Sequence, residues 1–314
     1  MDNKLTLSVS PHIHSGRSTT KIMLDVIIAL IPTAIAGIFI FGLRALAVIA
    51  LCIATCVLCE FLFNLIIKKK QTIGDLSAIV TGLLLALNLP ANIPLWQAAV
   101  GSIFAIVIVK CIFGGLGKNL VNPAITARVF MLLSFSAVGV AAFPRDSVAK
   151  FADTVSSATP LAAMNKGASL SLTDLLLGNH GGAIGEVCAV ALILGGIYLI
   201  VRKVITWHVP VAFIGFTFIF MFLFGGFDLH YSLAQVLSGG LLIGAIFMAT
   251  DYVTSPSTAW GKIIFGFGAA FLTVVIRLWA SLPEGVSYSI LLMNILCPYI
   301  DKLTPRKLFG GKKI

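Results

Sequence analysis

A hydroxyl-rich stretch, "DTVSSATPLAAMN" at residues 153–165, contains side chains of the kind that cap a helix or bind a phosphate group. Its candidate residues stand just before Pro160 and are Asp153, Ser156, Ser157, Ala158 and Thr159. A threonine before a proline predicts the start of a short helix, because threonine caps a helix and proline fits its first position. The free N–H groups at a helix start also bind phosphate. The stretch therefore predicts either a helix cap alone or a site for a phosphate-bearing group.

A second stretch, "FGGLGKNLVNPAITARVF" at residues 113–130, has the glycines and the lysine of a phosphate-binding loop. It is not a Walker A loop, because Asn119 stands where that motif needs Ser or Thr, and its glycine spacing does not fit a dinucleotide-binding turn. The residues fit one helix that ends near Gly117 and another that opens at Pro123. We expect either a structural helix–loop–helix or a site where the amides of Asn119 and Asn122 bond to a planar ligand at the membrane edge.

A third stretch, "ATDYVTSPSTAWGK" at residues 249–262, places Asp251 at the end of a long apolar run. Thr254 and Ser255 follow it and precede Pro256. Asp251 either caps an irregular segment or serves a function, because an ionisable group at membrane depth is a functional candidate.

Ionisable residues inside the apolar runs are further candidates. An isolated carboxylate there is costly, so Glu60 and Asp25 are candidates for a path that carries Na⁺ or H⁺. Glu60 lies the deeper of the two, and an ion pair within the helix bundle explains it equally well. Lys110, Arg128 and Arg277 lie near the ends of apolar runs, and we expect their side chains to extend to the membrane surface.

The elements that must position these residues are membrane helices. Of the 314 residues, 59% are hydrophobic and only 11% are charged, and the mean hydropathy is +1.04. These values lie outside the range of soluble domains, and one span takes about 20 apolar residues. We predict an all-α polytopic membrane protein with about ten transmembrane helices, of which the third is short and discontinuous. The predicted spans are 22–42, 45–67, 77–89, 95–113, 124–143, 184–201, 209–225, 232–250, 262–281 and 284–300.

The distribution of basic residues predicts the orientation, because lysine and arginine gather on the cytoplasmic side of a membrane protein. In the ten-span arrangement, 17 of the 22 basic residues lie on one side. The five on the other side are Arg44, Arg145, Lys150, Lys166 and Arg277. We therefore predict a cell-membrane protein with both termini in the cytoplasm and the loop 144–183 outside. The net charge of +10 follows from this topology and from a tail that suits anionic lipid, so no nucleic-acid partner is expected.

Two segments resemble each other across the halves of the chain, "IVTGLLLALNLP" at 79–90 and "VLSGGLLIGAIFMATDYVTSP" at 236–256. Five spans in each half predict two inverted repeats, with helices interrupted at 89–94, 114–123 and 251–256, although chance similarity is an alternative. The predicted division is an N-terminal segment 1–21, a first half 22–143, the loop 144–183, a second half 184–300 and a basic tail 301–314.

Six cysteines are present, and Cys52, Cys56 and Cys59 share one face of a helix. An iron–sulfur or metal site would explain them, but free cysteine is a common small apolar residue and no Cys-x-x-Cys pair occurs in a loop. We predict no metal site.

Together the three stretches resemble the signature segments of membrane subunits from the Rnf and sodium-pumping NADH:quinone oxidoreductase families. The pattern Asp-x-x-Ser-x-Ala-Thr at 153–159 resembles their flavinylation motif, and "GGLGKNLVNPA" and "FMATDYVTSP" resemble the other two segments. The resemblance extends over nearly the whole chain and is nearest to the D subunits of Rnf complexes, since related B subunits carry a longer N-terminal extension. Thr154 and Ser157 stand where the family commonly has Gly.

The resemblance implies an FMN that is joined through a phosphoester to Thr159, within a loop that contains Asp153, Ser156, Ser157 and Ala158, and that a separate flavin transferase installs. It also implies a second, non-covalent flavin, riboflavin. The candidates for its surroundings are Asn119, Asn122, Asp251, Thr254 and Ser255.

On this basis we predict a flavoprotein subunit of a membrane complex that passes electrons between ferredoxin and NAD and couples the transfer to export of Na⁺ or H⁺. The chain has neither a ferredoxin-type cysteine cluster nor an NAD-binding fold, so other membrane and peripheral subunits are expected partners. The alternatives are a B-type subunit of a sodium-translocating NADH:quinone oxidoreductase, a transporter or channel without a redox cofactor, and a structural membrane anchor.

Overall fold

The computed structural model describes residues 18–135, 138, 142, 160–165, 171–178, 180–280 and 284–305. Within these residues the protein consists of helices joined by turns, with one isolated β-bridge between Ala142 and Gly182. The predicted all-α class is therefore confirmed. The hydroxyl-rich candidates before Pro160, from Asp153 to Thr159, lie outside the described residues.

The helices follow the apolar runs of the sequence. In the first half they are α1 (Thr19–Phe41), α2 (Leu43–Ile66), the 3₁₀ turn η1 (Ile73–Asp75), α3 (Ser77–Leu87), α4 (Leu95–Ile103), the π-helical η2 (Phe104–Cys111) and α5 (Pro123–Ser134). In the rest of the chain they are α6 (Pro160–Asn165), α7 (Leu172–Leu177), α8 (Ala189–Val201), α9 (His208–Phe224), α10 (Leu229–Leu237), α11 (Leu241–Ile243), the π-helical η4 (Gly244–Met248), α12 (Ala259–Trp279) and α13 (Val286–Leu303). Each predicted span overlaps at least one of them.

Three of the described helices, α1, α2 and α12, are long and apolar enough to cross a membrane. A fourth candidate is α10 together with the α11–η4 segment, which is bent by 63° at a short break. Exposed apolar side chains such as Phe39, Leu43 and Ile66, each more than three-quarters exposed, suit a lipid environment. The polytopic membrane class is confirmed, whereas the number of ten spans stays a prediction.

Two short helices occupy the interior, and each follows or precedes a break in the chain. In α3, ten of the 11 residues are buried, and the α11–η4 segment is buried throughout. Helix α3 lies in the third predicted span of the first half, and the α11–η4 segment lies in the third predicted span of the second half. This agrees with the predicted pair of repeats, and their inverted relation stays a prediction. The predicted interruption of the third span is confirmed, since α3 ends at Leu87 and irregular backbone follows it.

Arginines satisfy the carbonyl groups that these breaks leave open inside the protein. After α3, Arg44 donates from Nε to Ala91 O (3.2 Å) and from Nη2 to Ile93 O (3.3 Å). At the end of α10, Arg277 donates from Nη1 to Gln235 O (2.6 Å) and from Nη2 to Ser238 O (3.1 Å). Irregular backbone is tolerated at membrane depth only when such partners exist. The expectation that Arg277 extends to the membrane surface is wrong, because this side chain is buried.

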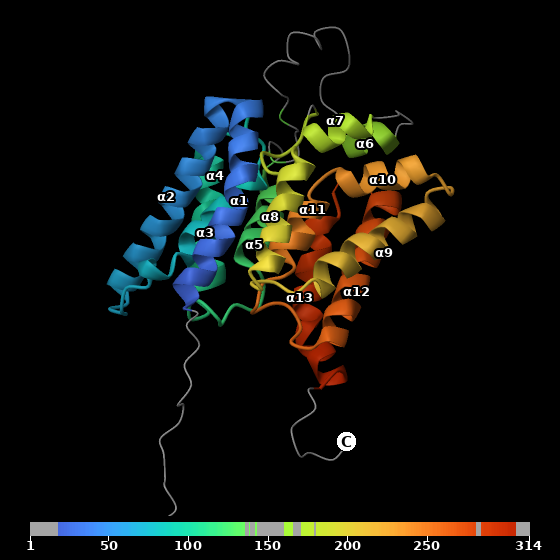
Figure 1. The fold of residues 1–314 in the computed structure, drawn as a ribbon. Helices are drawn as coiled ribbons and strands as arrows, with labels where there is room; N and C mark the ends of the chain where they lie inside the picture. The colour runs from blue at the N-terminus through green and yellow to red at the C-terminus, as the bar shows by residue number, and fades with distance from the viewer. Residues whose placement is uncertain are drawn as a thin grey trace, which may run out of the picture.

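The two ends of the helix bundle differ in charge. Helix α1 begins and α2, α8 and α13 end at one end, whereas α6 and α7 cover the opposite end above α10 (Figure 1). We call the first the basic end, because it carries Lys68, Lys69, Lys70, Arg202, Lys203, Lys262 and Lys302.

Candidate functional site

A cavity toward the basic end brings two of the three candidate stretches together. Asn119, Asn122 and Asp251 line it, along with apolar side chains of α1, α3, α8 and η4. We call it the Asn119 cavity. Thr254 and Ser255 do not line it; Ser255 lines a neighbouring pocket instead. The structure thus unites three of the five residues expected around a planar ligand.

Asn122 joins the two stretches and uses its whole amide to do so. Its Oδ1 accepts hydrogen bonds from Ala124 N (3.0 Å) and Ile125 N (3.3 Å), which caps α5. Its Nδ2 donates to Met248 O (3.2 Å) at the end of η4. The structural interpretation of Asn122 therefore accounts for its side chain.

Asn119 lines the same cavity, but its amide is not satisfied. The side chain is 8% exposed, and its Oδ1 is buried without a hydrogen-bond partner in the described part of the chain. A buried acceptor without a partner is costly and rare in folded proteins. An N–H donor of a ligand bound in the cavity would satisfy it.

The third stretch has an internal hydrogen bond, and a residue of α13 connects it to the second stretch. Thr254 donates from Oγ1 to Asp251 Oδ2 (3.1 Å), and burial raises the pKa of the Asp251 carboxyl, an effect that this hydrogen bond partly opposes. On α13, Asn294 accepts from Asn122 N (3.2 Å) and donates to Thr254 O (3.1 Å) in the amide orientation that satisfies both ends. Sequence reasoning missed Asn294, whose only signal is a lone amide within the last apolar run.

A buried ion pair borders the cavity. Lys110 Nζ lies 2.8 Å from Glu60 Oε2 and donates to Ser77 Oγ (2.6 Å), and Lys110 and Ser77 both line the cavity. Thr72 donates to the other carboxylate oxygen of Glu60 (2.6 Å). Lys110 is 1% exposed, so the expectation that it extends to the membrane surface is wrong. Pairing within the bundle explains Glu60, and a role in an ion path stays a prediction.

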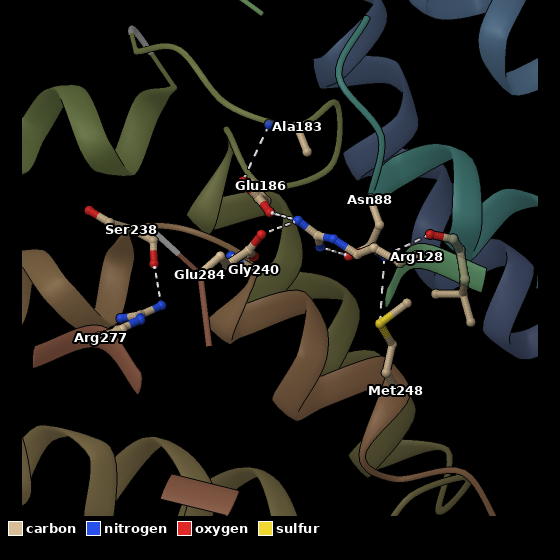
Figure 2. Close-up of polar contacts among 10 residues, drawn as sticks. Asn88, Arg128, Ala183, Glu186, Ser238, Gly240, Met248, Arg277 and Glu284 are labelled. Carbon is tan, nitrogen blue, oxygen red and sulfur yellow. Dashed lines mark hydrogen bonds and ion pairs between the residues drawn. The ribbon is translucent and has the colours of Figure 1, made fainter. Parts of the chain in front are cut away.

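A second buried ionic cluster connects the two helix breaks. Arg128 Nη2 bonds to both Glu186 Oε1 (2.9 Å) and Glu284, while its Nη1 donates to Asn88 at the end of α3 (Figure 2). Glu284 in turn accepts from Gly240 N (2.9 Å), where α11 begins. Arg128 is 4% exposed, so the expectation that it reaches the surface is also wrong. Sequence reasoning missed Glu284, whose only signal is its place as the first residue of the last predicted span.

Asp25 lies apart from these clusters in its contacts. Its carboxylate accepts from Tyr198 Oη (3.0 Å) and pairs with Arg202 Nη2 (3.2 Å), which connects α1 to the end of α8. Its role as an ion-path residue stays a prediction.

The hydroxyl-rich stretch continues into a described helix. As the Thr-Pro pair predicts, α6 begins at Pro160, and Leu161 and Met164 are buried with Leu175 of α7 and Ala234 of α10. The chain that follows Thr159 is therefore fixed at the end of the bundle opposite the basic end (Figure 1). Within the described residues, no group of three or more His, Cys, Asp or Glu side chains is placed to hold a metal ion.

Comparisons with known proteins extend over almost the entire chain. The model of the NQR2, RnfD, RnfE family matches residues 6–310. The chain is 46% identical to the D subunit of the Na⁺-translocating ferredoxin:NAD⁺ oxidoreductase complex of Acetobacterium woodii, an alignment that covers 99% of this chain and 96% of the relative. It is 42% identical to the D subunit of the proton-translocating ferredoxin:NAD⁺ oxidoreductase complex of Clostridium ljungdahlii, covering 99% and 98%. It is 33% identical to the D subunit of an ion-translocating oxidoreductase complex of Vibrio cholerae, covering 97% and 99%.

Proposed function

Because the chain belongs to the NQR2, RnfD, RnfE family, we propose that it is the D subunit of an Rnf-type complex. Such a complex passes electrons between ferredoxin and NAD and couples this transfer to the translocation of an ion. The observation that carries the proposal is the match over nearly the full length to subunits that bear this name. The named ions are Na⁺ in one relative and the proton in another, so the proposal includes both.

The other predicted functions have less support. A transporter without a redox cofactor and a structural anchor do not explain a family of oxidoreductase subunits. The B-type subunit of a sodium-translocating NADH:quinone oxidoreductase lies closer, but the relatives compared above are named as D subunits of ion-translocating oxidoreductase complexes. The remaining subunits of that complex are the partners of this chain, and the cell membrane is its location, with both termini in the cytoplasm.

The proposal includes an FMN joined by a phosphoester to Thr159, which a flavin transferase would install. Asp153, Ser156, Ser157 and Ala158 complete the motif that such an enzyme would recognise. Helix α6 supports this role, since its buried Leu161 and Met164 fix the chain just after the attachment point. Thr159 acts as an anchor and takes no part in the electron transfer itself.

A second, non-covalent flavin would occupy the Asn119 cavity. A bound flavin supplies the ability to accept or donate one or two electrons. The residues of this chain would hold it: the apolar lining suits a planar ring, and the Oδ1 of Asn119, which has no partner among the described residues, would accept from a ring N–H. Lys110 contributes an ammonium group at the cavity wall, held by Glu60.

Flavin fluorescence in a denaturing gel tests the proposal. The chain, produced in cells that contain the transferase, should give a band that fluoresces under ultraviolet light after denaturation. Thr159→Ala should abolish the fluorescence, and Thr154→Ala, which changes another threonine of the same loop, should keep it. A dark band from the wild-type chain would exclude the covalent flavin.

A further inference from the structure

A polar pocket and an apolar groove lie next to each other where α9 and α12 begin at the basic end. The polar pocket is lined by Thr206, Thr250, Tyr252, Ser255, Ser257 and Lys262 together with apolar atoms. The apolar groove is lined by Trp207 and Ile263, which follow Thr206 and Lys262 in the sequence, and by residues along α9. The α9 residues include His208, Val211, Gly215 and Phe216. Neither hollow has a role in the function proposed above.

The chemistry of the polar pocket favours an anion. Its polar side chains are five hydroxyls and one ammonium, and no carboxylate lines it among the described residues. Lys262 donates to Thr206 Oγ1 (2.9 Å), which fixes its charge at the wall between α12 and the start of α9. Asp301 of α13 accepts from Ser257 N (3.0 Å) and Oγ (3.2 Å), but this carboxylate does not line the pocket. Thr250 and Tyr252 donate to backbone carbonyl oxygens of Ile246 and Val204. The pocket's donors toward a ligand are therefore the Lys262 ammonium and the hydroxyls of Thr206 and Ser255, which suit the oxygens of a phosphate.

The groove has the length and polarity of a site for one acyl chain. It follows α9 from Trp207 to Ile219, which at 1.5 Å per residue is about 18 Å. One leaflet contributes about half of the roughly 30 Å hydrocarbon core of a bilayer. Trp207 is 54% exposed at the entrance, as expected for a tryptophan at the membrane interface. His208 lines the groove beside Trp207, and the rings of the two residues are stacked with centroids 4.2 Å apart.

We infer that this pocket and groove form a binding site for one anionic phospholipid in the leaflet at the basic end, with its phosphate at Lys262 and one acyl chain along α9. The pocket supplies the charge complementarity and the groove supplies the apolar contact, so both parts of an amphipathic ligand are matched. The polar pocket shares Ile205, Thr250 and Tyr252 with the Asn119 cavity, whereas Lys262 and the groove residues do not line that cavity. The inference does not depend on the flavin sites.

Two substitutions change the parts separately. Lys262→Met removes the charge and retains a long side chain, whereas Lys262→Arg keeps the charge. Gly215→Leu fills the groove, and a Cβ at Gly215 meets no atom within 4 Å, so the fold has room for it. Lys70→Met at the same end and Gly74→Leu, where a Cβ also meets no atom within 4 Å, are the matched controls.

Native mass spectrometry of the complex purified in detergent measures the bound lipid, with dioleoyl-phosphatidylglycerol and dioleoyl-phosphatidylcholine added in turn. The wild-type complex should retain one phosphatidylglycerol at concentrations where phosphatidylcholine is lost. Lys262→Met should weaken phosphatidylglycerol retention about fivefold, from about 1 kcal/mol for one lysine near a lipid surface. Gly215→Leu should weaken retention of both lipids, and Lys262→Arg and both controls should leave it unchanged.

Three results would overturn the inference. The first is equal retention of the two lipids, and the second is retention that neither Lys262→Met nor Gly215→Leu alters. The third is cross-linking of Gly215→Cys to another subunit, which would show that a protein partner fills the groove. Flavin content measured on the same samples separates this inference from the proposed function, because Lys262→Met should leave it unchanged.

Discussion

Asn119 and Asn122 stand three residues apart in one loop, and the structure uses their amides differently. Asn122 caps α5 and holds the end of η4, so its hydrogen-bonding groups are satisfied within the protein. Asn119 lines the same cavity with a buried oxygen that has no partner among the described residues. The spacing of the two asparagines could not show which amide caps a helix and which one is left for a ligand, because both residues lie just before the start of α5.

The two asparagines should therefore respond differently to alanine. Asn122→Ala should lower the stability of the fold by about 1–2 kcal/mol, the usual cost of a lost N-cap. Asn119→Ala removes an acceptor without a protein partner and should leave the unfolding temperature of the flavin-free protein nearly unchanged, while it lowers the amount of flavin that denaturation releases from the loaded protein. Thermal unfolding in detergent and quantification of released flavin measure the two effects. Full retention of flavin in Asn119→Ala would contradict the proposed second site.

The Lys110–Glu60 pair shows that a charged side chain near the end of an apolar run can be buried in the bundle instead of extending to the membrane surface. Lys110 lies near the end of an apolar run, but its partner comes from α2, which no local pattern identifies. Removing one member of a buried pair leaves the other charge uncompensated.

Lys110→Met should destabilise the protein by about 3–5 kcal/mol, because Glu60 then remains buried without its cation. The double variant Lys110→Met with Glu60→Gln should recover most of this loss, since no uncompensated charge remains. Unfolding midpoints of the single and double variants provide the measurement. A double variant no more stable than Lys110→Met would show that the pair does not act as a unit.

At the scale of elements, the short buried helices depend on close contact with their neighbours. Helix α3 lies against α2, and a Cβ placed on Gly82 would come within 2.9 Å of the backbone at Cys52 O and Ile53 Cα. Such a contact requires glycine, because backbone cannot move aside as a flexible side chain can. The sequence indicated that this span is short, but not which helix it contacts.

Gly82→Ala should therefore destabilise the protein by about 1–3 kcal/mol, the usual cost of overpacking. Gly215→Ala, on the open side of α9, should be neutral or stabilising by up to about 1 kcal/mol, because alanine is the better helix former and its Cβ meets no atom within 4 Å. Denaturation of both variants in the same detergent gives the comparison. Equal stabilities would refute the close packing of α3 on α2.

For the whole molecule, hydropathy and charge predict the fold class correctly, because a membrane requires apolar helices and excludes exposed backbone. They do not predict which helices are long enough to span alone, since buried half-helices such as α3 have the same composition as a span. They also miss the ionic clusters around Arg128 and Lys110, whose members come from segments remote in the sequence. The flavin interpretation of the motif at Thr159 depends on family resemblance, as its residues alone favour a helix cap.

The orientation of the bundle can be tested with single cysteines at its two ends. Ser171→Cys, next to α7, should react with a membrane-impermeant maleimide in intact cells. Lys70→Cys, at the basic end, should react only after the membrane is opened. The wild-type chain provides the background from its native cysteines. The reverse pattern would contradict the proposed topology.

Ion uptake by inverted membrane vesicles tests whether this chain takes part in ion-coupled electron transfer through a flavin at Thr159. Vesicles from cells that produce the complex receive reduced ferredoxin and NAD⁺, and NADH formation is followed together with uptake of Na⁺ or H⁺. We expect both activities with the wild-type chain and with Thr154→Ala, and loss of both with Thr159→Ala. Undiminished NADH formation and ion uptake with Thr159→Ala, or in vesicles that lack this chain, would contradict it.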